Sequence, residues 1–367
     1  MRPQRRLKNN LVIVCEGTDT EYLYFYDVAL YVQSTQPERF GLIKVVPSPK
    51  DVSEMIVVRQ AYKRKMRPDD RGGTHPECLY YVKEDHSKAE YDKNKAYPAR
   101  FVREAQLFLE EDEFTEAWAI YDKDIHPGHK RAIELANQDS RLHIGYSAYS
   151  FEEWILCHFE RNAYSYRHSV CEKKDCGVNN ARCKGHDCLV GRIRQKGYIG
   201  NYKKNISGLF KHYLYNRIKM ALINVSWLRF IGRIHEKELD MKLYQRNPYT
   251  TIDRFVTYLI NVPERYEWHS LKELFVFEKD EFCVDVKGDF LFIQLKGRGV
   301  HPLRDDRLFY CDENGNRSSS LITNPITLYD GRNEIKQRIN KSERYICLEE
   351  PKSLEYKVVI IELPIFS

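Results

Sequence analysis

Two short stretches decide the fold of this chain: Leu11-Val-Ile-Val-Cys-Glu-Gly17 and Trp118-Ala-Ile-Tyr-Asp-Lys-Asp124. Each begins with a short apolar run and ends in acidic residues, which is typical of a buried strand followed by a loop. Helical spacing of apolar residues follows both stretches, over residues 21–33 and 127–137. Alternating strands and helices predict an α/β fold, in which helices cover both faces of a parallel sheet.

The alternation continues on both sides of these stretches as far as residue 160. Further strands are predicted at 42–46, 79–82 and 142–146, and further helices from 51 or 53 to 66, at 99–111 and at 151–160. The pattern then changes, and we expect four parts: an α/β domain (1–165), a cysteine-rich insertion (166–190), a basic helical segment (191–262) and a β-rich domain (263–367). In the last part, polar turns separate short alternating runs, which favours an all-β structure.

The composition narrows the class of protein. With 42% hydrophobic and 31% charged residues, the chain is too apolar to be disordered, and its 18 Gly and 14 Pro are too few for a fibrous protein. It has no apolar run of the roughly 18 residues that a membrane span needs. The basic stretch 1–10 is followed by too short an apolar run for a signal peptide. We therefore expect a cytoplasmic protein that does not bind membranes.

The positive charge is concentrated in the middle of the chain. Residues 190–246 hold 13 Lys/Arg against 3 Asp/Glu, whereas residues 261–367 hold 16 against 19. A basic stripe favours a polyanionic partner such as nucleic acid, although a solvated helical face explains the charge equally well. The densest group, in which we predict phosphate contacts, consists of Arg192, Arg194, Lys196, Lys203 and Lys204.

Four of the ten cysteines lie close together with the spacing C-x4-C-x6-C-x4-C. They are Cys171, Cys176, Cys183 and Cys188. The segment holds few large apolar residues, so a metal would have to order it, and four thiolates can bind one tetrahedral Zn²⁺. We therefore predict a structural zinc site, in which His168 or His186 could replace one thiolate. An Fe–S cluster and a redox-active cysteine pair are the alternatives.

Acidic residues follow the predicted strands where a parallel sheet would bring them together. Glu16 ends the first stretch, and Asp122 and Asp124 end the second. Ligands of open α/β sheets bind outside the carboxyl ends of the strands, and carboxylates suit Mg²⁺. The pattern therefore predicts a Mg²⁺ or Mn²⁺ site, against the alternative that surface loops simply carry acids. Glu152, after the last strand, is a further candidate ligand or orienting residue, or else an acid at a helix N-terminus.

The two stretches resemble the first motif and the D-x-D motif of Toprim domains, in the form found in RloB-like proteins. Two further motifs of that branch follow in order: Ser150-Phe-Glu-Glu-Trp-Ile-Leu-Cys-His-Phe159 and Asn247-Pro-Tyr-Thr-Thr251. The resemblance covers roughly residues 8–260, and it includes neither the β-rich domain nor, with any clear match, the cysteine segment. It implies a Toprim fold and maps the family's acidic residues onto Glu16, Asp122 and Asp124.

The resemblance implies a Mg²⁺-dependent enzyme that hydrolyses phosphodiester bonds in DNA or RNA, tRNA included, in bacterial anti-phage defence. Asp122 and Asp124 would hold the ion, and Glu16 would bind a second ion or act as general base. Glu21 is read mainly as a first-turn helix acid and His158 as a core histidine. The alternatives are a non-catalytic nucleic-acid-binding or sensor module and a nucleotidyl-transfer or primase-like enzyme. Four roles stay open for the β-rich domain: it could sense a phage signal, dock other defence proteins, mediate homo-oligomerisation or give structural support.

Overall fold

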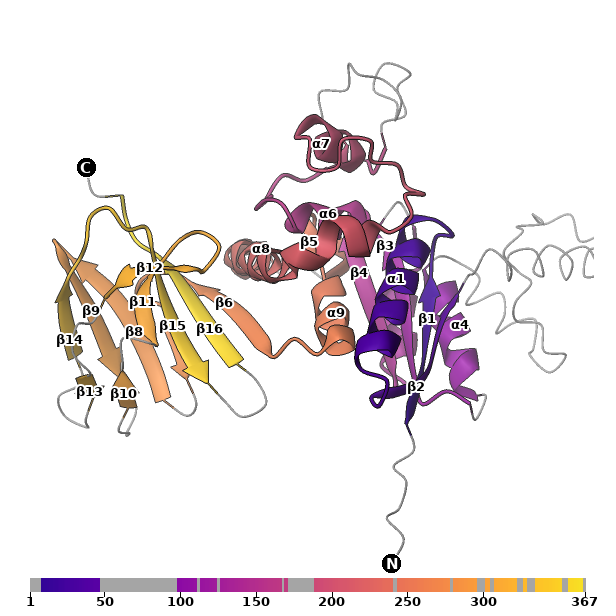
Figure 1. Cartoon of the computed structure of the whole chain (residues 1–367), viewed down its shortest axis with the longest axis horizontal. Coiled ribbons are helices and arrows are strands. Elements are labelled where there is room, and N and C mark those ends of the chain that lie inside the picture. Colours follow the sequence, from indigo (N-terminus) through magenta and orange to yellow (C-terminus); the bar gives the residue numbers. More distant parts are fainter. Residues whose placement is uncertain are drawn as a thin grey trace, which may run out of the picture. The chain divides into compact units, whose positions relative to one another are not determined.

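A computed structural model of the chain describes the following residues, to which every structural statement below refers: 8–46, 98–110, 113–123, 126–166, 168–170, 188–239, 243–277, 280–295, 301–303, 307–321, 326–328, 334–351 and 356–365. The chain forms two compact units (Figure 1). The first consists of Met1–Ile218 and Asp240–Asn261, and the second of Lys219–Leu239 and Val262–Ser367. The predicted helix at 51–66 and the predicted strand at 79–82 lie outside the described residues.

The first unit is built on a mostly parallel sheet. Its strands, in the described residues, are β1 (Asn9–Cys15), β2 (Phe40–Val46), β3 (Glu116–Asp122), β4 (Leu142–Ala148) and β5 (Tyr249–Thr250). They lie in the order β2-β1-β3-β4-β5, and only β5 runs antiparallel to its neighbour. β1 lies between β2 and β3, so the chain leaves β1 in one direction and returns on its other side. Such a switch point is where open α/β sheets bind ligands.

Helices cover both faces of this sheet, as Figure 1 shows. They are α1 (Thr20–Thr35), α4 (Ala99–Glu110), α5 (His129–Ala136) and α9 (Ile252–Ile260). Residues of α4 and α5 share one buried cluster with alternate residues of the strands, including Val12 and Val14. On the other face Phe255 of α9 stacks on Trp118 of β3, with ring centroids 4.1 Å apart, and Phe25 of α1 lies 5.1 Å from Phe255. The predicted α/β architecture with a parallel sheet is therefore confirmed.

The segment 247–251 departs from the helical periodicity expected around it, because it adds β5 to the sheet edge. The Ser147 and Thr250 hydroxyls lie 3.0 Å apart, and the Thr251 hydroxyl accepts the backbone N–H of Tyr146 at 2.9 Å. Side-chain hydroxyls that bond to a neighbouring strand thus override helix formation here. Shorter helical pieces of this unit are α6 (Glu152–Cys157), α7 (Leu189–Gln195), a π-helical turn (Phe210–Leu214) and two 3-10 turns (Tyr215–Arg217 and Leu243–Gln245).

The second unit is a β-sandwich with a helix against one sheet. One sheet has the strand order β12-β11-β15-β16-β6 and the other β14-β9-β8-β7, with β10 and β13 paired separately. The strands are β6 (Glu264–His269), β7 (Leu274–Phe277), β8 (Asp280–Lys287), β9 (Phe290–Leu295), β10 (His301–Leu303), β11 (Leu308–Cys311), β12 (Arg317–Ser320), β13 (Ile326–Leu328), β14 (Glu334–Arg338), β15 (Tyr345–Pro351) and β16 (Tyr356–Glu362). The predicted β-rich character of the C-terminal part is confirmed.

Two apolar layers hold the second unit together. The first lies between the sheets and includes Phe282, Leu291 and Ile346. The second joins the other face of the β6-containing sheet to α8 (Ile218–Leu239) and includes Ile223 and Trp268. Most of α8 thus belongs to the second unit, so the predicted basic segment 191–262 is shared between the two units.

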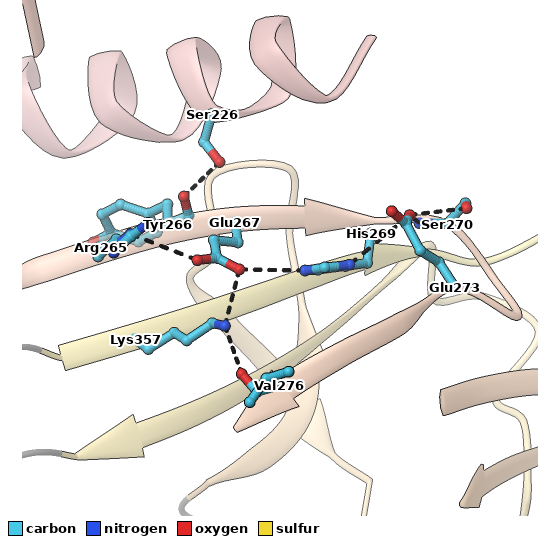
Figure 2. Close-up of polar contacts among 9 residues, drawn as sticks. All are labelled: Ser226, Arg265, Tyr266, Glu267, His269, Ser270, Glu273, Val276 and Lys357. Atoms are coloured by element: carbon cyan, nitrogen blue, oxygen red, sulfur yellow. Dashed lines mark hydrogen bonds and ion pairs between the residues drawn. The ribbon is translucent and has the colours of Figure 1, made fainter. Parts of the chain in front are cut away.

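A polar cluster fixes β6 at the edge of its sheet (Figure 2). Glu267 lies 2.9 Å from the Lys357 ammonium and 3.4 Å from Nε2 of the buried His269. Burial would raise the pKa of Glu267, but hydrogen bonds from His269 and Lys357 lower it to about 2. Ser226 of α8 donates to the Tyr266 carbonyl at 2.6 Å. β6 is therefore held by α8 on one side and by β16 on the other.

Within the described residues, no helix is both long enough and apolar enough to cross a membrane.

Candidate functional site

The site begins at the switch point, where Glu16 follows β1 and Asp122 is the last residue of β3. The backbone N–H of Glu16 donates to the Ile120 carbonyl at 2.9 Å, which extends the β1–β3 pairing by one step. In return, the Glu16 carboxylate accepts the backbone N–H of Asp122 at 2.8 Å. The two predicted site residues are therefore coupled directly, and the parallel pairing of their strands is the cause.

Glu21 joins them from the first turn of α1. Its side chain is buried, and a Cβ added to Gly17 would lie 2.6 Å from its Oε2 atom. Gly17 thus leaves the space into which the carboxylate of Glu21 fits. One residue earlier, the Thr20 hydroxyl donates to the backbone carbonyl of Lys204 at 2.7 Å. This contact ties the start of α1 to the segment that carries Lys204.

Glu152, the first residue of α6, is the fourth acid and is 1% exposed. Its Oε2 atom accepts the hydroxyls of Ser150 at 2.6 Å and Ser169 at 2.9 Å, and its Oε1 atom accepts that of Tyr202 at 3.0 Å. The Lys204 ammonium lies 3.7 Å from Oε1. Residues from three separate stretches therefore hold this carboxylate in place, far more than a solvated acid at a helix N-terminus needs.

Electrostatics link these four residues, Glu16, Glu21, Asp122 and Glu152, which we call the acidic cluster. Burial raises the pKa of Asp122 well above its usual range, and the charges of the other three acids raise it further. Burial, followed by the charge of Glu152, raises the pKa of Glu21 to about 7. The positive charge of Lys204 lowers both values, but it does not outweigh the other effects. Lys204 therefore offsets only part of the cost of ionising Glu21 and Asp122.

A divalent cation would suit this donor set. Crowded buried carboxylates repel one another, and a cation that replaces their protons removes that cost. Among the described residues, no three His, Cys, Asp or Glu side chains are arranged as a ready-made metal site. Asp124, the predicted partner of Asp122, lies outside the described residues. The chemistry of the acidic cluster thus fits a divalent cation.

Two histidines near these acids differ in role. His126 places Nε2 3.3 Å from Oε1 of Glu16, whereas the Asp122 N–H donates to the other oxygen of that carboxylate. His158 is fully buried on α6, where its Nδ1 atom lies 2.9 Å from the Trp154 carbonyl. Burial lowers the pKa of His158 to about 3, so it is a neutral core histidine, as predicted.

Three of the four cysteines predicted to bind zinc, Cys171, Cys176 and Cys183, lie outside the described residues. The fourth, Cys188, is buried, and its Sγ atom accepts the backbone N–H of Gly191 at 3.2 Å at the start of α7. Cys188 also pairs with His168 through an isolated parallel bridge. The ends of the cysteine segment therefore meet, and zinc binding stays a prediction.

The predicted phosphate-binding residues have different surroundings. Arg192 makes two hydrogen bonds of 2.7 Å to the carboxylate of Glu160, and Arg194 donates to the Tyr202 carbonyl. Lys204 faces Glu152, as described above, whereas Lys196 and Lys203 are exposed. Arg192, Arg194 and Lys204 thus have partners within the protein, of which only that of Lys204 belongs to the acidic cluster, and a phosphate role for all five stays a prediction.

Sequence reasoning had not placed Glu21 or Lys204 in the site. The sequence favours a first-turn helix acid for Glu21 and a phosphate contact for Lys204. The available signal for Glu21 was the glycine that follows Glu16, since a loop glycine next to acids often permits close approach. No comparable signal marks Lys204, because it reaches Glu152 from 52 positions along the chain.

Comparison with known proteins supplies the family. The family model of the RloB-like protein matches residues 11–259, about two thirds of the chain. The chain belongs to the RloB-like family. The match contains all four residues of the acidic cluster and ends before the β-sandwich begins, so the sandwich strands β6 to β16 lie beyond the part that the family model describes. No curated protein and no solved structure matches the chain.

Proposed function

We propose that this RloB-like protein is a Mg²⁺-dependent nuclease with a Toprim-type catalytic unit, acting on DNA or RNA in anti-phage defence. The acidic cluster at the β1–β3 switch point supports the proposal most strongly. Buried carboxylates at the carboxyl edge of a parallel sheet are suited to a cation that contacts a substrate phosphate. The resemblance of residues 11–17 and 118–124 to two Toprim motifs agrees with this assignment.

Each residue of the site would have its own role in the reaction. Asp122, Asp124 and Glu16 would hold Mg²⁺, and Glu21 and Glu152 would complete or orient the set. A bound Mg²⁺ would polarise the scissile phosphate and neutralise the charge that develops on it. Glu16, anchored by the Asp122 N–H, or Glu21, whose pKa lies near neutrality, would accept the proton of the attacking water. Ser150, Ser169 and Tyr202 would keep Glu152 in one orientation.

The test is a cleavage assay with purified full-length protein. Supercoiled DNA, single-stranded DNA, tRNA and mRNA are each incubated with Mg²⁺, Mn²⁺ or EDTA. We expect cleavage of at least one substrate, abolished by EDTA and reduced at least about a hundredfold by Asp122→Asn, since a cation and proton-transfer groups contribute rate factors of this size. Incorporation of labelled nucleotides in place of cleavage would favour nucleotidyl transfer.

Two buried glutamates on α6 provide a matched pair of variants. Glu152 belongs to the acidic cluster, whereas its neighbour Glu153 is equally buried and has the Asn162 amide 3.5 Å from its carboxylate. We expect Glu152→Gln to lose cleavage and Glu153→Gln to keep it. Equal activity of both folded variants would show that the acidic cluster is not the catalytic site.

We also propose that the four cysteines bind one structural Zn²⁺. The meeting of His168 and Cys188 brings the two ends of the segment together, as a closed metal loop requires. Metal analysis of the purified protein should find one zinc per chain, and Cys176→Ser should lose it. Absence of zinc from the wild-type protein would leave the Fe–S cluster and the redox-active cysteine pair as the alternatives.

A further inference from the structure

The four-stranded sheet of the sandwich has an outer face on which two phenylalanines lie among three basic residues. Phe290 and Phe292 alternate along β9 with Leu291 and Ile293, which enter the core. Because side chains alternate along a strand, the two rings lie on the side away from the core. Phe290 is 37% exposed, so part of its ring is open to solvent.

Basic residues surround the rings through the strand register. Lys287 of β8 and Arg338 of β14 pair with Phe290 on its two sides, and Lys336 of β14 pairs with Phe292. The Lys336 ammonium lies 4.3 Å from the centre of the Phe290 ring, and that of Lys287 lies 5.1 Å from the Phe292 ring. We call these five residues the aromatic–basic face: Lys287, Phe290, Phe292, Lys336 and Arg338.

The acids near this face do not cancel its charge. Asp285, opposite Phe292, accepts the Val286 N–H and lies within 4.0 Å of both Lys272 and Lys287. Asp289, in the turn before Phe290, pairs with Lys341 at 2.9 Å. Glu334 lies at the next register position and accepts from Gln294. Lys287 is thus partly neutralised by Asp285, whereas neither Lys336 nor Arg338 lies within ion-pair distance of an acid in the part of the chain that the structure describes.

From this juxtaposition we propose that the aromatic–basic face binds single-stranded nucleic acid, with bases stacked on Phe290 and Phe292 and phosphates held by the basic residues. Aromatic rings on a sheet bind unstacked bases, and flanking cations follow the backbone. The lysines that now cover the rings do not prevent this, because stacking a base is worth more than an exposed cation–π contact. Once displaced, their ammonium groups can pair with phosphates.

Single strands fit this face better than a duplex. A duplex keeps its bases stacked on one another, so the rings could reach only its edges. The face is also separate from the acidic cluster in the chain, and the proposal stands whether or not the first unit cleaves nucleic acid. Its function would be to hold single-stranded nucleic acid on the second unit.

The test measures the binding of fluorescent (dT) and (rU) oligonucleotides of about 12 nucleotides by anisotropy, a length within the site sizes of single-strand binders. Full-length protein is used without added Mg²⁺ or Mn²⁺, so that the proposed structural zinc is kept, binding is observed without Mg²⁺-dependent cleavage, and the two proposals can fail separately. The double variant Phe290→Ala/Phe292→Ala should bind at least about tenfold more weakly than wild type. Lys336→Ala should weaken binding and reduce the salt slope by about one.

Arg265→Ala is the matched control. Arg265 carries the same charge as Lys336, is 67% exposed and lies on β6 of the other sheet, so its removal should change affinity less than about twofold. The substituted rings lie outside the core, and thermal unfolding should confirm that the variants fold. Photo-cross-linking with 5-iodouridine should attach the oligonucleotide at Phe290 or Phe292. Wild-type affinity in the double variant, or cross-links confined to the first unit, would overturn the proposal.

Discussion

Replacing Glu21 by Gln should stabilise the first unit at alkaline pH. Burial and the charge of Glu152 raise the pKa of Glu21 from 4.5 to about 7. At about 1.4 kcal/mol per pKa unit, ionising this buried carboxyl costs the fold about 3 kcal/mol, an upper value because neighbouring acids share the effect. Since the folded-state pKa is raised, the cost is absent below pH 4.5, grows as the pH rises to 7 and is complete above it.

Hydrogen exchange followed by mass spectrometry on peptides from β1 and α1 measures this cost in the first unit alone. Without divalent cations, Glu21→Gln should protect these peptides more than wild type at pH 8, and equally at pH 4.5. Mg²⁺ should stabilise the wild-type unit more than the variant, because a ligand stabilises the state that binds it.

Glu153→Gln supplies the control for that experiment. Burial raises the pKa of Glu153 to about 8, so this variant should also relieve an alkaline cost. Its response to Mg²⁺ should match that of wild type, because Glu153 lies outside the acidic cluster. Lower protection of Glu21→Gln than of wild type at pH 8, or a wild-type stability that is flat between pH 5 and 8, would refute the electrostatic reasoning.

Three further substitutions test single contacts, one in the second unit and two in the first. The urea midpoint of the second unit should fall as the pH drops from 4.5 towards 2, because the folded protein lowers the pKa of Glu267 to about 2. Glu267→Gln should remove this pH dependence. Gly17→Ala should cost about 1–3 kcal/mol in the hydrogen-exchange stability of β1, since its Cβ would meet Glu21; an unchanged value would contradict the close approach. Phe255→Ala should cost about 3–5 kcal/mol in the same measurement, because it removes the ring stacked on Trp118; a loss below 1 kcal/mol would contradict that packing.

The parallel sheet was predictable because its strands are buried on both faces. Residues 11–15 are all fully buried, so β1 is a continuous apolar run that no solvated element would show. The rule that ligands bind at the carboxyl ends of such strands then placed Glu16 and Asp122 together. Both predictions depend on local sequence, and this is why they succeeded.

The remaining features depend on distant contacts. β6 reads Glu-Arg-Tyr-Glu-Trp-His, in which no apolar run marks a strand. It is a strand through its pairing with β16, almost a hundred residues later. Lys204 approaches Glu152 only after the segment around Tyr202 packs beside α6 and α1. No local sequence pattern marks β6 or Lys204, since β16 and Glu152, which they contact, lie elsewhere in the chain.

The most direct test of the central claim, that the acidic cluster is a divalent-cation site, is a Mn²⁺ titration followed by electron paramagnetic resonance. At pH 8, wild-type protein should bind Mn²⁺, because the cation can replace the protons of the buried carboxyls, and Mg²⁺ should displace it. Asp122→Asn and Glu152→Gln should weaken binding strongly, whereas Glu153→Gln should not. Unchanged Mn²⁺ binding in Asp122→Asn and Glu152→Gln would contradict the claim.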